Sequence, residues 1–135
     1  MRLVLDTTAF SAAMRRDSAL MKLFEKCRPG DIVTVPPVVA EIQYGLERLD
    51  KASKKFNLLK SERDKWLSVI TVLPWSNEAS ERFGEIKADL ERSGRLIDDF
   101  DIAIAAIAMA HKCSVLTANL GHFQRIKQLK SKSWI

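Results

Sequence analysis

Short apolar runs alternate along the chain with longer segments in which apolar residues recur at helical spacing. The short runs occupy residues 3–5, 32–35, 71–73 and 114–117 and are almost continuous in apolar or β-branched residues. Strands that are buried on both faces of a parallel sheet have this composition, whereas half-exposed strands alternate between apolar and polar residues. The pattern therefore predicts four buried strands.

Helical spacing is found in the segments between these runs, at 18–26, 36–46, 51–69, 77–93 and 98–111, with a short further helix near 122–127. Pro36 and Pro37 suit the first turn of the second helix. Asn77 is expected to cap the fourth helix, and Gly94 suits its C-terminal stop. The segment 98–111 is apolar on nearly every side, which predicts a buried helix.

Strands that alternate with helices indicate an α/β fold with a mainly parallel sheet that is covered by helices on both faces. The length of 135 residues predicts one domain over 1–135. Ligands of such folds bind outside the carboxyl ends of the strands. The polar residues at those ends are therefore the first candidates for a functional site.

Acidic and amide side chains stand where the predicted strands end and where the following helices begin. Asp6 directly follows the first strand, and Asn119 lies two residues beyond the fourth. In an α/β fold these positions reach one edge of the sheet. The helices add Glu41, Asp98, Asp99 and Asp101 to this set.

Asp101 is the most informative of these acids. It lies in the first turn of the apolar helix, where an ionised carboxylate beside a core is costly unless it is paired or bound to a metal. Arg95 is the only basic residue between Gly94 and His111, and acids without matching bases raise one another's pKa. A divalent cation removes this cost, and oxygen ligands suit Mg²⁺ or Mn²⁺.

Structural roles are open for several of the same acids. Asp98 or Asp99 could be a helix N-cap, since acids in a first turn are favoured by the helix dipole. Asp6 could be a turn residue at the end of a strand. Glu41 could be a solvated helix residue, because no local signature surrounds it.

The overall composition is that of a folded and moderately basic protein. Apolar residues make up 47% of the chain, which excludes a disordered chain. The 22 basic and 17 acidic residues give a formal net charge of +5. A polyanionic partner, above all a nucleic acid, is compatible with this charge.

Several cellular settings and site types are disfavoured. The longest apolar run, 102–110, is much shorter than the roughly 20 residues needed to cross a bilayer. Cys27 and Cys113 have no paired spacing and are typical of a reducing cytoplasm, which predicts a cytoplasmic protein without membrane contact. His111, Cys113 and His122 match no zinc-binding spacing.

Four motifs occur in sequence order at the predicted strand ends and helix starts: Asp6-Thr7-Thr8, Glu41-Ile-Gln-Tyr-Gly45, Asp101-Ile-Ala-Ile-Ala-Ala106 and Thr117-Ala-Asn119-Leu-Gly-His122-Phe123. Over essentially the whole chain they resemble those of the PIN-domain ribonucleases, most closely the VapC toxins of bacterial type II toxin–antitoxin systems. The resemblance implies a three-layer α/β/α sandwich around a mainly parallel sheet. It also implies cleavage of RNA that depends on Mg²⁺ or Mn²⁺.

By this resemblance Asp6, Glu41 and Asp101 match the three core acids of the family, which are expected to bind the metal and to act in catalysis. Relatives often carry a fourth acid just beyond the fourth strand, where Asn119 stands here, so a second metal site is in doubt. Supporting roles at the site are expected for Thr7, Asp99 and Asn119.

The basic residues near the C-terminus form a run without acids, which includes Arg125, Lys127, Lys130 and Lys132. The run begins just after the Asn119 motif, so we expect Arg125, Lys127 and Lys130 to flank the acids and to contact RNA phosphates. A solvated tail is the alternative interpretation.

The resemblance also implies protein partners, namely a VapB-like antitoxin and a second copy of the chain in a homodimer. The antitoxin would place an amphipathic helix in an apolar groove. We expect this groove near Ala12, Leu20, Leu23 and Tyr44.

Two other functions compete with a toxin nuclease that acts on tRNA or another structured RNA. One is an RNA-processing nuclease of the same fold outside a toxin–antitoxin pair. The other is a non-catalytic PIN module that binds nucleic acid or a protein partner. The three retained acids argue against the second, because a binding module has no need of carboxylates that repel one another.

Overall fold

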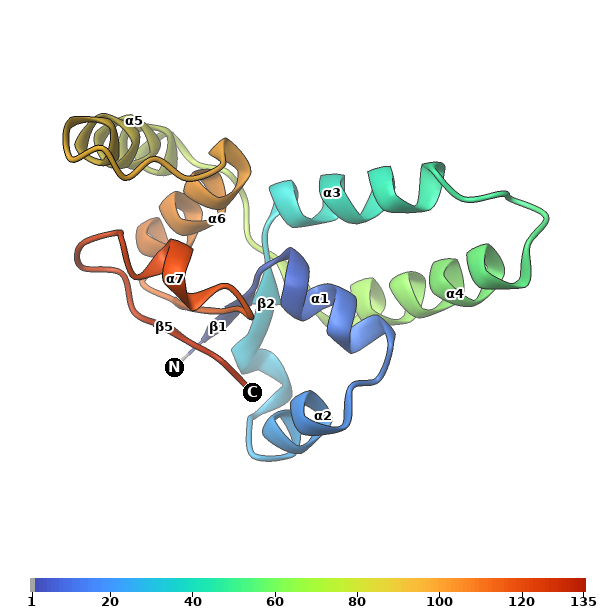
Figure 1. Ribbon diagram of the computed structural model, residues 1–135. Helices are drawn as coiled ribbons and strands as arrows, with labels where there is room; N and C mark the ends of the chain where they lie inside the picture. The colour runs from blue at the N-terminus through green and yellow to red at the C-terminus, as the bar shows by residue number, and fades with distance from the viewer. Residues whose placement is uncertain (1) are drawn as a thin grey trace.

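The computed structural model describes residues 2–135, and within them five parallel strands form one sheet in the order β3-β2-β1-β4-β5 (Figure 1). The strands are β1 (Leu3–Leu5), β2 (Ile32–Thr34), β3 (Thr71–Val72), β4 (Ser114–Leu116) and β5 (Ser131–Lys132). All four pairings are parallel, and β1 lies at the centre with Leu5 opposite Leu116 of β4. The carboxyl ends of β1 and β4 therefore meet at one edge of the sheet.

Helices cover the sheet on both sides, so the predicted α/β sandwich is confirmed. In Figure 1 the first four helices lie to one side of the strands, and α5 and α6 lie together on the other. A short 3₁₀ turn, Pro29–Asp31, precedes β2. The helices are α1 (Thr7–Met14), α2 (Ser18–Glu25), α3 (Pro36–Glu47), α4 (Lys54–Val69), α5 (Asn77–Arg92), α6 (Asp99–Ala110) and α7 (Leu120–Phe123).

The buried helix predicted at 98–111 is confirmed. In α6 every residue from Ile102 to Ala108 is buried. Helix α6 packs closely against α5, and its isoleucines and most of its alanines belong to the same buried core as the central strands. The stop at Gly94 is also confirmed, since its φ of +68° is a backbone conformation that glycine adopts at no steric cost.

Two elements are absent from the sequence-based prediction. Helix α1 begins directly after Asp6 with two threonines and contains mostly small residues, so its apolar periodicity is weak. Strand β5 has only two polar residues and is held by backbone bonds, such as the one that the Thr117 N–H donates to the Lys132 carbonyl. Side-chain patterns cannot reveal a strand of that kind.

Three predicted boundaries were wrong. Ser76, not Asn77, caps α5 by accepting a bond from the Ala79 N–H, and α7 begins at Leu120, before the predicted start at residue 122. Helix α4 begins at Lys54 because Ser53 caps it. Of the residues expected near an antitoxin groove, Ala12 and Leu20 are fully buried in the core and cannot line it, whereas Leu23 is partly buried and Tyr44 is exposed.

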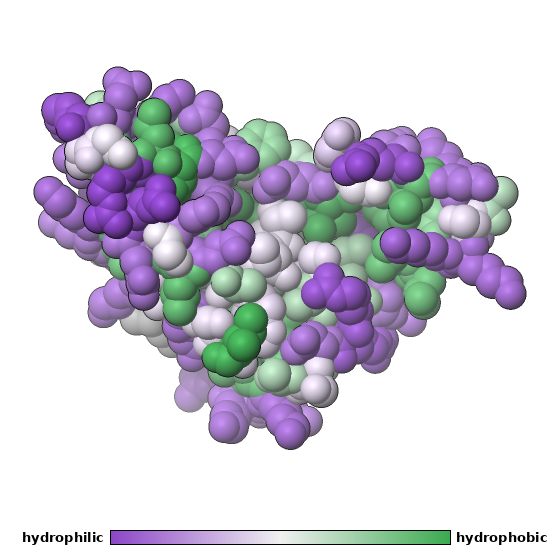
Figure 2. Space-filling model, viewed as in Figure 1, coloured by the Kyte–Doolittle hydropathy of each residue, from purple (hydrophilic) through white to green (hydrophobic). Residues whose placement is uncertain are grey.

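Helices α3 and α4 extend to one side as an antiparallel pair (Figure 1). Two contacts anchor α4 to α1: the Trp66 indole N–H donates to the Ala13 carbonyl at 3.0 Å, and Arg16 pairs with the buried Glu62 at 3.0 Å. The surface in the same view is largely hydrophilic, with hydrophobic patches over the α3–α4 pair and near the α5–α6 connection (Figure 2). No helix in residues 2–135 has the length and apolar character needed to span a membrane.

The buried isoleucines of α6 provide a test of this core. Ile104→Ala should lower the free energy of unfolding by about 2–5 kcal/mol, because the fully buried side chain would leave a cavity. The control Leu58→Ala, at a position that is 63% exposed, should change it by no more than about 0.5 kcal/mol. Urea unfolding followed by circular dichroism would measure both, and equal effects would contradict the core assignment.

Candidate active site

Asp6 lies at the end of the central strand and is the most deeply buried acid of the site. Its Oδ1 accepts the Ala9 N–H at 2.9 Å, which caps α1, and the Thr8 hydroxyl at 2.6 Å. Its Oδ2 accepts the Thr117 hydroxyl at 2.5 Å. Burial raises the pKa of Asp6, these hydrogen bonds lower it, and the charge of Asp101 raises it further. Asp6 is therefore more than a turn residue at the end of a strand, because its side chain joins β1, α1 and the end of β4.

Glu41 reaches the same edge of the sheet from α3. Its Oε1 accepts the Thr7 hydroxyl at 2.5 Å, so the first residue of α1 fixes the orientation of this carboxyl group. Burial raises the pKa of Glu41, the Thr7 bond lowers it, and the charges of Asp101, Asp98 and Asp6 raise it again. Glu41 is therefore not a freely solvated helix residue.

Asp101 completes the group from the first turn of α6, with its side chain 18% exposed. Its Oδ2 lies 3.1 Å from Nδ1 of His122 on α7. Burial raises the pKa of Asp101, the His122 contact lowers it, and Asp98 raises it. Among the three predicted acids, the charge of Asp101 raises the pKa of Asp6, and the charges of Asp101 and Asp6 raise the pKa of Glu41, so the structure brings them close together.

The supporting residues take different positions. Asp98 is the N-cap of α6, where its Oδ1 accepts the Phe100 N–H at 2.9 Å, and its charge also acts on Glu41 and Asp101. Asp99 is 58% exposed and pairs with Lys87 of α5 at 3.1 Å. Asn119 contributes its backbone N–H, which donates to the Thr117 hydroxyl at 2.8 Å, and its side chain does not cap α7.

Sequence reasoning missed Thr117 and His122 as parts of the site. The signal for Thr117 was present, because parallel strands in register place the residues after Leu5 and Leu116 side by side. His122 depends on where α7 begins, and that boundary was predicted too late in the chain. Once α7 begins at Leu120, Nδ1 of His122 stands beside Asp101.

The residues that were predicted to contact RNA phosphates lie in two different parts of the structure. The Arg125 guanidinium donates to the backbone carbonyls of Arg95 and Leu96 at 3.4 and 3.1 Å, so it ties the segment after α7 to the α5–α6 connection. Lys127 and Lys130 line separate hollows beside α5 and α6.

The donor chemistry of the site fits a hard divalent cation, although the side chains do not form a ready coordination shell. Within residues 2–135, no three His, Cys, Asp or Glu side chains are placed to hold an ion together. Threonine hydroxyls occupy oxygens of Asp6 and Glu41 instead. Carboxylates that raise one another's pKa gain stability from a cation, and their oxygens suit Mg²⁺ or Mn²⁺.

Comparison with known families decides the assignment. The family model described as "PIN domain" matches residues 3–129. The chain belongs to the PIN-domain family. The match spans β1 to the segment before β5 and includes the four elements that carry the acids and His122.

Curated relatives of this PIN domain are VapC proteins. "Ribonuclease VapC2" of Rickettsia felis is 33% identical over 72% of this chain and 69% of the relative. "Ribonuclease VapC2" of Haemophilus influenzae is 29% identical over 90% of this chain and 88% of the relative. The "tRNA(fMet)-specific endonuclease VapC" of Shigella flexneri is 24% identical over 99% of this chain and 98% of the relative.

Solved structures agree with this fold. The chain aligns with VapBC2 from Rickettsia felis, crystallised with a DNA fragment from its promoter, with a TM-score of 0.87, 27% identity and complete coverage of both chains. It also aligns with VapBC-1 from nontypeable Haemophilus influenzae, with a TM-score of 0.84, 23% identity and coverage of 99% and 98%.

The raised pKa of Asp101 predicts that removal of its charge stabilises the folded protein. A carboxyl group whose pKa is raised by folding contributes stability below its ordinary pKa of about 3.9, and this contribution is lost as pH rises through the folded pKa. At pH 7 the metal-free Asp101→Asn protein should therefore melt at a higher temperature than the parent.

Thermal denaturation in chelator at pH 4 and pH 7 would measure this difference. The gain should shrink at pH 4, because a carboxyl group with a raised pKa takes up its proton more readily as the pH falls. Glu91→Gln, at an exposed position on α5, is the matched control and should show no comparable gain. An unchanged or lower melting temperature for Asp101→Asn at pH 7 would contradict the proposed repulsion.

Proposed function

We propose that this PIN domain is a metal-dependent endoribonuclease and the toxin of a type II toxin–antitoxin pair. The observation that carries the proposal is the group of Asp6, Glu41 and Asp101, which converge from three elements on one edge of the sheet and whose pKa values are all raised by burial and by the charge of neighbouring acids. The names of the relatives, which are VapC ribonucleases, support it. A non-catalytic module would be more stable without these acids.

The proposed roles follow from the contacts of each residue. Asp6 and Asp101 would hold Mg²⁺ or Mn²⁺ directly, and Glu41 would bind it through water or orient the attacking water. The bound ion supplies positive charge at the phosphate and lowers the pKa of water. Thr117 and Thr8 hold the carboxylate of Asp6 in one orientation.

Three further residues would position these groups or the RNA. Thr7 holds Glu41, and His122 holds Asp101. Asn119 is exposed beside the site and would bind phosphate through its amide group. Asp99 faces α5 through its Lys87 pair, so we assign it only an indirect effect on the charge of the site.

The proposed substrate is a structured RNA, such as a tRNA. The support comes from the relative of Shigella flexneri that is named a tRNA(fMet)-specific endonuclease and that aligns with nearly the whole chain. The excess of 22 basic over 17 acidic residues favours a polyanionic substrate. Cleavage of such an RNA fits the cytoplasmic location predicted from Cys27 and Cys113.

Loss of one acid should abolish the activity while the fold is kept. Asp101→Asn should slow Mg²⁺-dependent cleavage of a tRNA transcript by about 10²–10⁴-fold, because a metal site contributes several kcal/mol to the transition state. Gel analysis of the products with Mg²⁺, with Mn²⁺ and with chelator would measure it. Glu91→Gln should cleave normally, and full cleavage by Asp101→Asn would overturn the proposal.

The proposed protein partners are a VapB-like antitoxin and a second copy of the chain. The structural neighbours are VapBC toxin–antitoxin complexes, which supports the antitoxin. Light scattering of the purified chain should give the mass of a dimer, twice 15.3 kDa. A strict monomer at concentrations near 100 µM, where even a weak dimer would be populated, would exclude the homodimer.

A further inference from the structure

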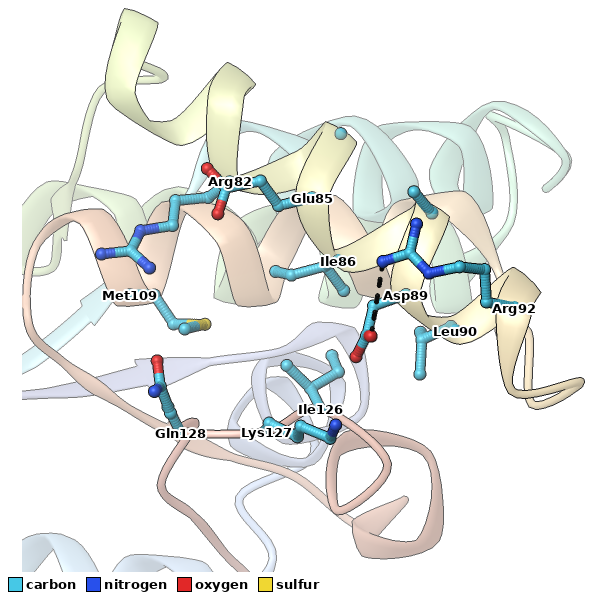
Figure 3. A pocket seen from close by; sticks show the side chains of 12 residues that line it. Arg82, Glu85, Ile86, Asp89, Leu90, Arg92, Met109, Ile126, Lys127 and Gln128 are labelled. Carbon is cyan, nitrogen blue, oxygen red and sulfur yellow. Dashed lines mark ion pairs between the residues drawn. The ribbon is translucent and has the colours of Figure 1, made fainter.

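A cavity of about 680 Å³ lies between α5, the end of α6 and the segment 126–128 (Figure 3). Its floor is apolar and is formed by Ile86, Leu90, Met109 and Ile126. Its rim carries charged and polar side chains. In Figure 3 Arg82 and Gln128 border one end near Met109, while Lys127 and the Asp89–Arg92 pair border the other.

A second hollow of about 280 Å³ continues from the first. Both are lined by Arg82, Met109 and Gln128, and the second adds Lys112, Lys130 and the start of β4. We call the two together the basic groove. Its cations are Arg82, Arg92, Lys112, Lys127 and Lys130.

Four of the five cations that line the basic groove make no ion pair in the part of the chain that the structure describes. Arg92 pairs with Asp89 at 3.6 Å, but for the part of the chain that is described, Arg82, Lys112, Lys127 and Lys130 make no ion pair within 4 Å. Glu85 is the one other acid that lines the cavity. Like charges around one hollow repel one another, so an anion that binds there gains from all of them.

The backbone of Lys112 adds an independent observation. This residue follows the end of α6 with φ +56°, a conformation at a helix end that glycine normally adopts. A lysine there costs roughly 1–2 kcal/mol relative to an unstrained backbone. The chain nevertheless places a long cation at this position, and its side chain lines the groove.

The basic groove and the acids lie at opposite ends of β4. Ser114, the first residue of β4, lines the groove, whereas Thr117, directly after β4, bonds to Asp6. A strand of three residues spans roughly 10 Å, so one phosphate cannot contact both places. A ligand that reaches both must be an extended polyanion.

We propose that the basic groove is a second binding site for the RNA substrate, which holds the backbone of a folded RNA while the acids cleave it elsewhere. This proposal rests on the proposed ribonuclease function. The cations would contact phosphates, and the apolar floor would receive riboses or an unstacked base. The groove would raise the affinity for long folded RNA without affecting a short strand that reaches only the acids.

Binding measurements in the inactive Asp101→Asn background test the proposal. The groove variant combines Arg82→Gln, Lys112→Gly and Lys127→Gln, and the glycine keeps the left-handed backbone without strain. The control variant combines Lys22→Gln, Lys26→Gln and Lys55→Gln, which removes the same charge from exposed positions on α2, α4 and the turn after α2. A tRNA transcript and a dinucleotide, whose single phosphodiester cannot contact both places, are the probes.

The groove variant should bind the tRNA at least about 10-fold more weakly, and its slope of log Kd against log salt should fall by about 2, since about three phosphate contacts are lost. The control variant should bind the tRNA nearly as the parent does. With Asp101 restored, the groove variant should cleave the dinucleotide at the parental rate.

Three results would overturn the proposal. The first is that the groove variant binds the tRNA with the affinity of the parent. The second is that the groove variant and the control variant lose tRNA affinity equally. The third is that the groove substitutions convert a dimer to a monomer, which would make the groove an interface between copies. Failure of the parent to cleave either RNA would instead reject the ribonuclease function. The difference in tRNA affinity is measured without cleavage, so the two failures are distinguishable.

Discussion

The carboxylate of Asp6 is the constraint on which the site and much of the sheet edge depend. It ends the central strand, caps α1 through Ala9 and receives the hydroxyl of Thr117 from the end of β4. A buried carboxylate needs all of these donors, because an unpaired one would cost several kcal/mol. The need to satisfy one side chain therefore fixes how β1, α1 and β4 meet, and it places the other acids around that point.

The remaining acids are held by hydroxyl and imidazole groups rather than by lysine or arginine. Thr7 orients Glu41, and His122 lies against Asp101. The threonine hydroxyls keep the carboxylates of Asp6 and Glu41 in position without neutralising their charge, whereas a lysine in their place would compete with a metal ion for the same oxygens. The raised pKa values of the three acids are the cost of this arrangement. A chain that needed only stability would have replaced them.

Features set by side-chain composition could be predicted from the sequence, whereas features set by backbone pairing could not. Helix α6 was evident from its apolar residues, and Asp6 and Asp101 from their positions at the end of a strand and the start of a buried helix. Strand β5 is invisible because Ser131 and Lys132 join the sheet through backbone bonds alone. The role of His122 required the start of α7, which no capping side chain marks.

The net charge of +5 conceals a separation of charge that the fold produces along one short segment. Within residues 117–130 the chain leaves the acidic edge at Thr117, contacts Asp101 through His122, and reaches the basic groove at Lys127 and Lys130. Between them Arg125 fastens the segment to the connection before α6. The acids repel phosphates and the cations of the groove attract them, so the proposed RNA contacts of the groove lie away from the repulsion at the metal-free site. A change in Arg125 would then alter the spacing between the two sites rather than the chemistry of either one.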